Sequence, residues 1–419
     1  MVSTTIAEPP QIATPASGAP GLLRSDRIVS VDLMRGIVMV IMALDHVRDY
    51  FSFLQFQPED LTQTYGWLFF TRWITHLCAP TFFFLAGTGA YLSKKRGAEL
   101  SNFLWKRGLW LVFLELTLIA FAWTFVPFAG LAGQTIWALG WSMVILALLV
   151  RLPFRAITIF ALGMIVLHNA FDRVVPGAFG KMGWVWTILH RPGFIPIKPP
   201  YVGIFVLYPL IPWMAVMAAG YVFGALLQKP VDQRRKAFLT LGGAMILAFV
   251  VLRATNIYGN PPIGFGFASP GPFAVQKTTE LTVISFFNVE KYPPSLQYLL
   301  MTLGPAIMLL AWFDKVDLKS GIGRFWDKIL VFGRVPMFYY ILHIFLIHIM
   351  AIVAALAFQQ PAAWLWRGAF LSQPPPNGYG HGLAFVYLVW LVALVILYFP
   401  CKWYAGLKQR RKDWWLSYI

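Results

Sequence analysis

Apolar segments of about twenty residues follow one another along most of this chain, with short polar connections between them. An α-helix needs roughly 20 mostly apolar residues to cross a hydrocarbon core. Windows of that length predict about ten membrane-spanning helices. The expected spans are residues 33–53, 71–92, 103–125, 136–150, 156–170, 201–227, 238–252, 296–313, 329–358 and 383–399. The pattern therefore predicts an all-α polytopic membrane protein with both termini on one side of the membrane.

The composition supports this class, because 58% of the 419 residues are hydrophobic and 12% are charged. A net charge of +17 raises the possibility of nucleic-acid binding. The basic residues instead fall between the spans, and most of the 34 lie in connections on the side of the N-terminus. Lys and Arg are biased to cytoplasmic loops. We therefore predict cytoplasmic termini, insertion in the inner (plasma) membrane and no nucleic-acid partner.

The segments outside the spans differ in composition. Residues 1–26 are rich in Pro, Ala, Ser and Thr and lack the apolar core of a signal peptide, which predicts a disordered cytoplasmic tail. Residues 27–405 would form one transmembrane domain, and residues 406–419 a basic and aromatic cytoplasmic tail. Three long connections are predicted on the outside, where they would cover an external acceptor site: residues 171–200, 253–295 and 359–382.

The first span carries an unusual number of ionisable residues: Arg35, Asp45, His46, Arg48 and Asp49. Such groups are costly at membrane depth and usually mark a functional site. Arg35 and His46 are eleven residues apart, about three helical turns, so they share one helix face roughly 16 Å apart. The alternative is that Arg35 flanks the span on the cytoplasmic side and the other residues lie at the outer interface.

Four titratable residues from four spans are predicted at one depth: His46, His76, Glu115 and His343. Counting 1.5 Å per residue from the cytoplasmic ends places them roughly 18–24 Å into the membrane. Four such groups in a chain this poor in charge predict a shared polar cavity in the outer half of the membrane. His348 points about 140° away from His343 and is expected to be structural.

Several other chemistries lack their usual motif. No HExxH or similar pair of ligands lies on one helix, so we predict no metal site. The chain contains no GxxxxGK[ST] phosphate loop and no GxSxG nucleophile elbow. The two cysteines, Cys78 and Cys401, are predicted on opposite sides of the membrane and are treated as packing residues.

Three segments carry a family resemblance: RIVSVDLMRGIVMVIMALDH, HLCAPTFFFLAGTGAYLSKK and FGRVPMFYYILHIFLIH. Together they resemble the heparan-α-glucosaminide N-acetyltransferase-like membrane acyltransferases, specifically the bacterial branch, and are more distantly similar to polysaccharide O-acyltransferases. The matching features are the Arg and His eleven residues apart in the first helix, an FFxLxG core, and a late helix with Gly, Tyr and His. In this chain they are Arg35 and His46, residues 83–87, and Gly333, Tyr339 and His343.

The resemblance implies transfer of an acyl group, expected to be acetyl, from acetyl-CoA or another acyl-CoA on the cytoplasmic side to an external saccharide or similar acceptor. Arg35 would hold a coenzyme phosphate. His46 would act as general base, with Asp49 orienting its ring on the same helix face. His343 or His76 would donate to the developing oxyanion, and Glu115 completes the predicted catalytic set.

The chain departs from the lysosomal branch at one point. That branch has an acetylated histidine in the loop after the first helix, whereas residues 52–70 contain no histidine. Direct transfer with His46 as base is therefore favoured over an acyl-histidine intermediate. If an intermediate forms, His46 and His76 are its candidate carriers.

The main alternative is a secondary transporter or exporter of an anionic lipid or sugar precursor. Transporters use broken helices at mid-membrane, and Pro80 and Pro305 could break two spans. A transporter has no need of the Arg35–His46 spacing or of coenzyme A, so coenzyme dependence separates the two hypotheses. A scaffold without chemistry is disfavoured by the cost of burying His46, Glu115 and His343.

Overall fold

The computed structural model describes residues 28–93, 95–127, 131–198, 202–261, 270–318, 320–366, 375–411 and 413–418. Each predicted span is found as helix. In chain order these helices are α1 (Val29–Phe51), α2 (Gly66–Thr75) with α3 (Cys78–Leu92), α4 (Gly97–Leu114) with α5 (Ala120–Thr124), α6 (Thr135–Leu149), α7 (Phe154–Leu167), α9 (Leu210–Phe223), α10 (Val231–Thr255), α12 (Leu296–Phe313), α13 (Gly323–Arg334) with α14 (Pro336–Ala357), and α15 (Leu383–Arg410). Two further helices, α8 (Gly183–Leu189) and α11 (Thr279–Phe287), lie in long connections. The predicted tail 1–26 lies outside the described residues.

Eight helical segments among the described residues are long and apolar enough to cross a membrane. The remaining two predicted spans depart from this standard for different reasons. The helix α6 has 15 residues, fewer than a typical span. The helix α1 has 23 residues but carries several charged side chains along its length. The protein is therefore an all-α polytopic membrane protein, and its first helix is the one that carries the candidate chemistry.

The structure corrects two predicted span boundaries. The sixth span does not begin at residue 201, because residues Val202–Val206 form strand β3 and α9 begins only at Leu210. Strand β3 lies between β1 (Ala132–Gly133) and β2 (Gly193–Lys198) in a three-stranded sheet that hydropathy did not reveal. The ninth span is two helices, because the chain breaks at Val335 and Pro336 starts α14, where its missing N–H is tolerated.

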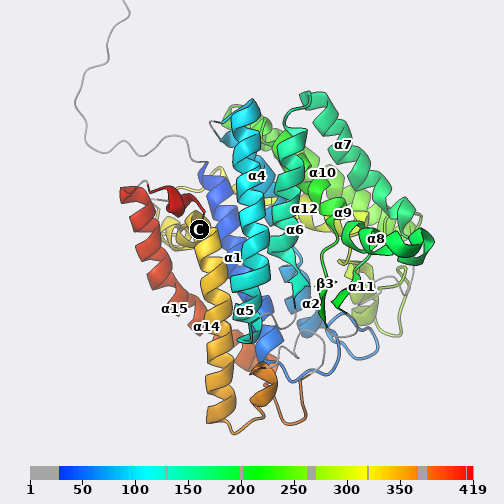
Figure 1. The fold of residues 1–419 in the computed structure, drawn as a ribbon, viewed down its shortest axis with the longest axis vertical. Coiled ribbons are helices and arrows are strands. Elements are labelled where there is room, and N and C mark those ends of the chain that lie inside the picture. The colour runs from blue at the N-terminus through cyan, green and yellow to red at the C-terminus, as the bar shows by residue number, and fades with distance from the viewer. Residues whose placement is uncertain are drawn as a thin grey trace, which may run out of the picture.

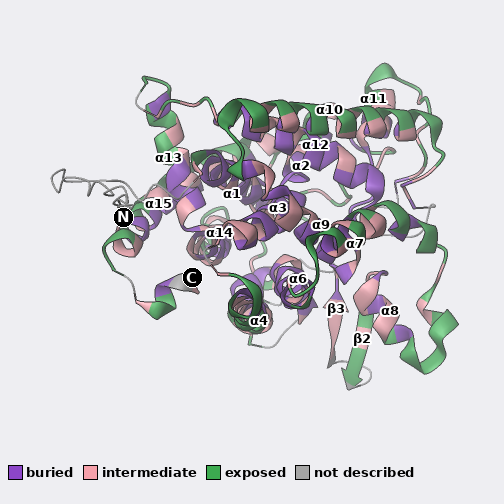
Figure 2. Ribbon diagram, turned by 90° about the horizontal axis from the view of Figure 1, so that it is seen from above, coloured by how far each residue is buried: buried purple, intermediate pink, exposed green. Residues whose placement is uncertain are grey.

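The helix α1 lies near the centre of the bundle and packs against α3, α12, α13, α14 and α15 (Figure 1). A view along the bundle shows α1 and α3 mostly buried, whereas the outer face of α10 is exposed (Figure 2). The crossing of α1 and α13 is close, because a Cβ atom on Gly333 would lie against the carbonyl of Asp32. Small residues allow such close approach of membrane helices. This packing holds the charged helix in the interior, away from lipid.

The FFxLxG segment of α3 is a packing element. Phe83, Phe84 and Leu85 are all buried. A Cβ atom on Gly87 would collide with the backbone of α9 at Met217, so the two helices meet backbone to backbone. These side chains therefore face protein and not lipid, and the segment packs α3 against α9.

Contacts at the two ends agree with the predicted order of the connections. At one end, Arg234 makes a two-point ion pair with Asp314 at 2.6 and 2.8 Å, and Ser30 donates to the same carboxylate at 2.6 Å. At the opposite end, Gln55 donates to the carbonyl of Pro375 at 2.7 Å. We call these the inner and outer ends, following the predicted orientation, which itself stays a prediction.

Candidate active site

His46 of α1 and His343 of α14 form a direct pair near the outer end of the bundle. Nδ1 of His46 lies 2.7 Å from Nε2 of His343, and the two rings stack with centroids 4.9 Å apart. His343 is fully buried, and His46 is half-buried. The structure thus brings together two of the four histidine and glutamate side chains that were predicted at one depth.

The backbone determines the protonation pattern of this pair. Nδ1 of His343 lies 3.1 Å from the carbonyl oxygen of Tyr339, one turn earlier in α14. A carbonyl oxygen only accepts, so Nδ1 of neutral His343 carries the proton and Nε2 is an acceptor. His46 must then donate from its Nδ1, which leaves its Nε2 unprotonated. The arrangement presents Nε2 of His46 as a proton acceptor.

Aromatic side chains surround the histidine pair. The ring of Trp123 meets His46 edge-on at 4.9 Å, and Tyr339 stacks on His343 at 5.2 Å. Tyr340 contacts His343 from another side, with centroids 5.4 Å apart. These rings shield the pair from solvent and restrict the orientation of both imidazoles.

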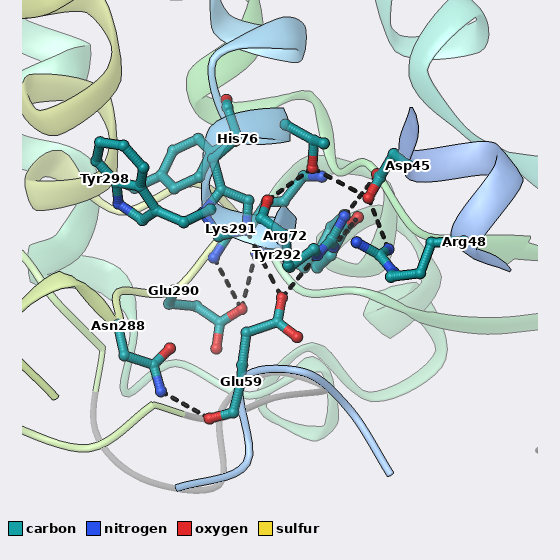
Figure 3. A network of polar contacts seen from close by, with 12 residues as sticks. Asp45, Arg48, Glu59, Arg72, His76, Asn288, Glu290, Lys291, Tyr292 and Tyr298 are labelled. Carbon is teal, nitrogen blue, oxygen red and sulfur yellow. Dashed lines mark hydrogen bonds and ion pairs between the residues drawn. The ribbon is translucent and has the colours of Figure 1, made fainter. Parts of the chain in front are cut away.

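Asp45, the residue before His46, belongs to a separate network of ion pairs (Figure 3). Its carboxylate pairs with Arg48 and with Arg72 of α2, each at 2.6 Å. Asp45 and Arg48 are three residues apart on α1, so their side chains are neighbours on the helix surface. Arg72 also donates to Glu59 at 2.8 Å, which attaches the loop after α1 to α2. All four side chains are well buried, so the pairs compensate for removal of their charges from water.

His76 lies in this network and not beside His46. Its Nε2 is 3.6 Å from Glu59, and its ring packs against Tyr298 of α12 at 5.3 Å. Pro80 has no N–H to donate to the carbonyl of His76, and the hydroxyl of Tyr298 donates to that carbonyl at 2.9 Å. The break between α2 and α3 therefore lies at the candidate site.

Burial alone would raise the pKa of Glu59, but the charge of Arg72 and the nearby imidazole of His76 outweigh burial and hold that pKa well below its usual range. Glu59 is consequently ionised at any physiological pH. It anchors the loop between α11 and α12, because Asn288 donates to the carbonyl of Glu59 at 2.8 Å.

The loop between α11 and α12 adds three ionisable residues to the site. Burial raises the pKa of Glu290 to about 7, although the N–H groups of Tyr292 and Lys291 oppose the shift. Burial also acts to raise the pKa of Tyr292, but the charges of Lys291 and Arg72 lower it overall. Lys291 itself is 8% exposed. The loop thus places a carboxyl group and an ammonium group near Arg72 of α2 and His76 (Figure 3).

Arg35 lies toward the inner end of α1, on the predicted side. Its guanidinium pairs with Asp32 and donates to the carbonyl of Leu85 in α3, each at 3.1 Å. The side chain is 25% exposed. A guanidinium has five N–H donors, so the contacts with Asp32 and Leu85 leave capacity for an incoming anion. Its role as a phosphate ligand stays a prediction.

Glu115 has a clear structural task. Its carboxylate accepts the N–H groups of Ile136 and Trp137 at 2.9 and 3.1 Å. These are orphan donors in the first turn of α6, and a carboxylate there also complements the helix dipole. Glu115 therefore joins α4 to the start of α6, and the described contacts do not place it in the histidine pair. Its predicted catalytic role is untested.

Asp49 and His348 also have defined contacts. Asp49 pairs with Arg48 at 2.8 Å and is the most exposed member of the first helix's charged set, and no described hydrogen bond joins it to His46. His348 lies 2.9 and 3.0 Å from the carbonyls of Ala122 and Leu365, as expected for a structural histidine. The predicted orienting role of Asp49 stays a prediction.

Sequence reasoning missed the residues that join the site's elements. Arg72 lies inside the predicted second span, and a charge at that position was a readable signal. Glu59 and Lys291 lie in connections, where charged residues are common and give no signal. Among the described residues, no group of three or more His, Cys, Asp or Glu side chains is arranged to hold a metal. The predicted absence of a metal cofactor stays a prediction.

The histidine pair lies within a bundle of apolar helices. Residues 27–258 match the sequence profile described as heparan-alpha-glucosaminide N-acetyltransferase, catalytic. The match covers more than half of the chain, which therefore belongs to this family of membrane acyltransferases. It includes Arg35, His46, His76 and Glu115, whereas Lys291 and His343 lie beyond it. No curated protein matches the chain.

Proposed function

We propose that the protein transfers an acyl group, most simply acetyl, from acyl-CoA at the inner end of the bundle to a saccharide or similar acceptor at the outer end. The observation that carries this proposal is the chain from the Tyr339 carbonyl through His343 to His46. It presents an unprotonated Nε2 on the helix face that also bears Arg35. The protein would work in the inner membrane, embedded in the bilayer.

The two ends of α1 would serve the two substrates. Arg35 is partly exposed at the inner end, where its guanidinium would hold a phosphate of the coenzyme by charge-assisted hydrogen bonds. The eleven residues to His46 correspond to roughly 16 Å of helix, a distance that an extended pantetheine arm can cover. The thioester would then lie beside the histidine pair.

Direct transfer requires one base. Nε2 of His46 takes the proton from an acceptor hydroxyl or amine, while the oxygen or nitrogen of the acceptor attacks the thioester carbonyl carbon. The C–S bond then breaks, and the imidazolium returns the proton to the leaving thiolate, which gives free CoA. His343 accepts a hydrogen bond from His46 throughout, so it orients the ring and stabilises the imidazolium form.

The first test is acetyl-CoA binding and CoA release by the detergent-purified protein. Arg35→Ala is expected to weaken acetyl-CoA binding, because it removes the phosphate ligand. Arg324→Ala is the matched control, since Arg324 is an exposed arginine near the same end of the bundle. Acetyl-CoA affinity should be unchanged in that control.

His46→Ala should keep acetyl-CoA binding and lower turnover by about 10²–10⁴, the usual contribution of a general base. His381→Ala is its control, because the His381 ring stacks on Phe385 at 4.0 Å, away from the histidine pair. If the native protein binds no acyl-CoA, the enzyme proposal fails and transport of an anionic precursor becomes the leading hypothesis.

A further inference from the structure

Lys291 is the one basic residue of the site whose charge has no direct carboxylate partner among the described residues. It lies in the loop between α11 and α12, its ammonium is 5.1 Å from the centre of the Tyr292 ring, and it is 8% exposed. Within the described part of the chain, no ion pair or side-chain hydrogen bond engages this ammonium. A buried cation without a carboxylate partner is costly to maintain.

The other two cations of the site are already neutralised. Arg48 pairs with both Asp45 and Asp49, and Arg72 pairs with both Asp45 and Glu59. Negative charge that develops at the site would have to compete with these carboxylates for either guanidinium. No carboxylate in the described part of the chain competes for Lys291 in this way.

Lys291 lies beside the network of ion pairs that joins α1 to α2. Figure 3 shows Lys291 beside His76 and Arg72, above the carboxyl group of Glu290. Arg72 pairs with Asp45, the residue before His46, at 2.6 Å. Lys291 therefore lies at the same end of α1 as the histidine pair, where the acceptor and the thioester would meet.

The loop is held in one conformation by its own contacts. The N–H of Ser295 donates to the carbonyl of Glu290 at 3.0 Å, and Lys291 pairs with Pro294 across the turn. The Glu290 carboxyl group accepts the N–H groups of Lys291 and Tyr292 at 3.1 and 2.8 Å. Electrostatic catalysis requires a donor that is positioned before the reaction, and this loop supplies one.

We propose that Lys291 is a catalytic residue whose ammonium stabilises the oxyanion formed on the thioester carbonyl during acyl transfer. This inference rests on the proposed function. As the acceptor attacks, the carbonyl π electrons move to oxygen, and Lys291 donates a hydrogen bond to that oxygen. When the carbonyl re-forms, the C–S bond breaks and the thiolate takes the proton held by His46. Lys291 ends the cycle unchanged.

His343 and His76 were the donors expected from the sequence. The two nitrogens of His343 are engaged with His46 and with the Tyr339 carbonyl, so it has no proton to offer an oxyanion. Among the described residues, neither buried nitrogen of His76 has a hydrogen-bond partner, so His76 is the competing donor. The experiment has to separate Lys291 from His76.

The test measures CoA release from acetyl-CoA by the full-length protein in lipid nanodiscs, with water or added monosaccharides as acceptors. Lys291→Met is expected to lower kcat about 10²–10³, the usual effect of losing one oxyanion donor, and to leave the Kd for acetyl-CoA unchanged. Lys291→Arg keeps the charge and should recover at least a tenth of the native kcat. His76→Phe should lower kcat less than tenfold.

A merely structural Lys291 would behave differently. Added ethylammonium should restore part of the turnover of Lys291→Ala without raising its unfolding midpoint, which a packing role cannot produce. The inference is overturned if folded Lys291→Met keeps kcat within threefold of native, if Lys291→Arg is as inactive as Lys291→Met, or if His76→Phe alone causes the large loss. If the native protein releases no CoA and transfers no acetyl group, the proposed function falls, and the inference falls with it.

Folding is checked by the thermal unfolding midpoint of each variant. If Lys291→Met unfolds, Lys291→Arg and the ethylammonium rescue decide the question. If ethylammonium restores turnover but not the unfolding midpoint, the result supports the catalytic role. If it restores turnover and the unfolding midpoint together, the ammonium stabilises the loop, and the inference is overturned.

Discussion

Asp45 and His46 are neighbours in the chain, yet α1 directs them into two different environments about 100° apart around its axis. Asp45 is held by Arg48 and Arg72, each at 2.6 Å, in a network of fixed charges. His46 meets uncharged partners, the imidazole of His343 and the ring of Trp123. One side of the helix is therefore electrostatically saturated, whereas the other keeps a free proton-accepting nitrogen.

This difference separates two uses of buried polar groups. The ion pairs of Asp45 join α1, α2 and the loop that carries Glu59, so they build the site. The histidine pair has a single proton pattern set by a backbone carbonyl, and it can change protonation without breaking the network. The comparison predicts that mutations in the network act mainly on stability and that mutations in the pair act mainly on turnover.

The largest effect is expected from Arg72→Met. It leaves the buried carboxylate of Glu59 without its cation, and breaking a buried pair typically costs about 3–5 kcal/mol of the free energy of unfolding. The measurement is the thermal or denaturant midpoint in nanodiscs. Lys95→Met is the control, because the exposed Lys95–Glu99 pair should contribute less than about 1 kcal/mol. Equal stability of Arg72→Met and native protein would contradict the structural role of the network.

Glu290→Gln tests how the charge of the buried Glu290 carboxyl group affects the free energy of unfolding as pH changes. Folding raises the pKa of this carboxyl group from 4.5 to about 7, so the folded protein binds a proton that the unfolded chain releases. The associated stability is present below pH 4.5 and is lost as pH rises through 7. The neutral Gln variant should match native protein near pH 5 and exceed its unfolding free energy at pH 8.5 by on the order of 3 kcal/mol.

The control for this experiment is Asp60→Asn, a change in the nearby loop after α1. Hydrogen bonds with Thr62 lower the pKa of Asp60, so its ionised carboxylate stabilises the folded protein at high pH. Asp60→Asn should therefore not raise the unfolding free energy at pH 8.5. A gain at pH 8.5 in both variants would show a general charge effect and not a property of Glu290.

His343→Gln tests the pair. It should lower kcat roughly ten- to a hundred-fold, less than the loss for His46, because the base remains but its ring is no longer oriented. The affinity of His343→Gln for acetyl-CoA should be unchanged. His348→Gln is the matched control on the same helix: its carbonyl contacts are structural, so stability and not kcat should fall. Similar kcat losses in both variants would remove the special status of His343.

The smallest effect is expected from Asp49→Asn. Asp49 is more exposed than Asp45 and pairs with Arg48, so its removal should change stability by less than about 1 kcal/mol and kcat by less than about threefold. A kcat loss as large as that of His343→Gln would instead support the predicted role of Asp49 in orienting His46.

Much of the fold could be predicted because the bilayer constrains sequence strongly. Backbone groups in lipid must be satisfied within helices, so long apolar segments correspond to spans. The errors lie where this constraint is weakest. Strand β3 precedes α9 within one apolar stretch, and the break at Val335 divides another. Hydropathy records polarity and does not record where a helix begins within an apolar run.

The sequence by itself determined that this is a polytopic membrane protein, that α1 carries the candidate catalytic residues, and that Arg35 and His46 share a helix face, because each property depends on local composition or on helical period. Only the tertiary structure decided which polar groups meet. It placed His343 against His46, and it placed the Glu115 carboxylate at the start of α6, where it accepts a backbone N–H. It also brought Arg72, Glu59 and Lys291 to the outer end of α1 (Figure 3). Depth along a helix can be counted from sequence, whereas the rotation and neighbours of each helix depend on packing between segments far apart in the chain.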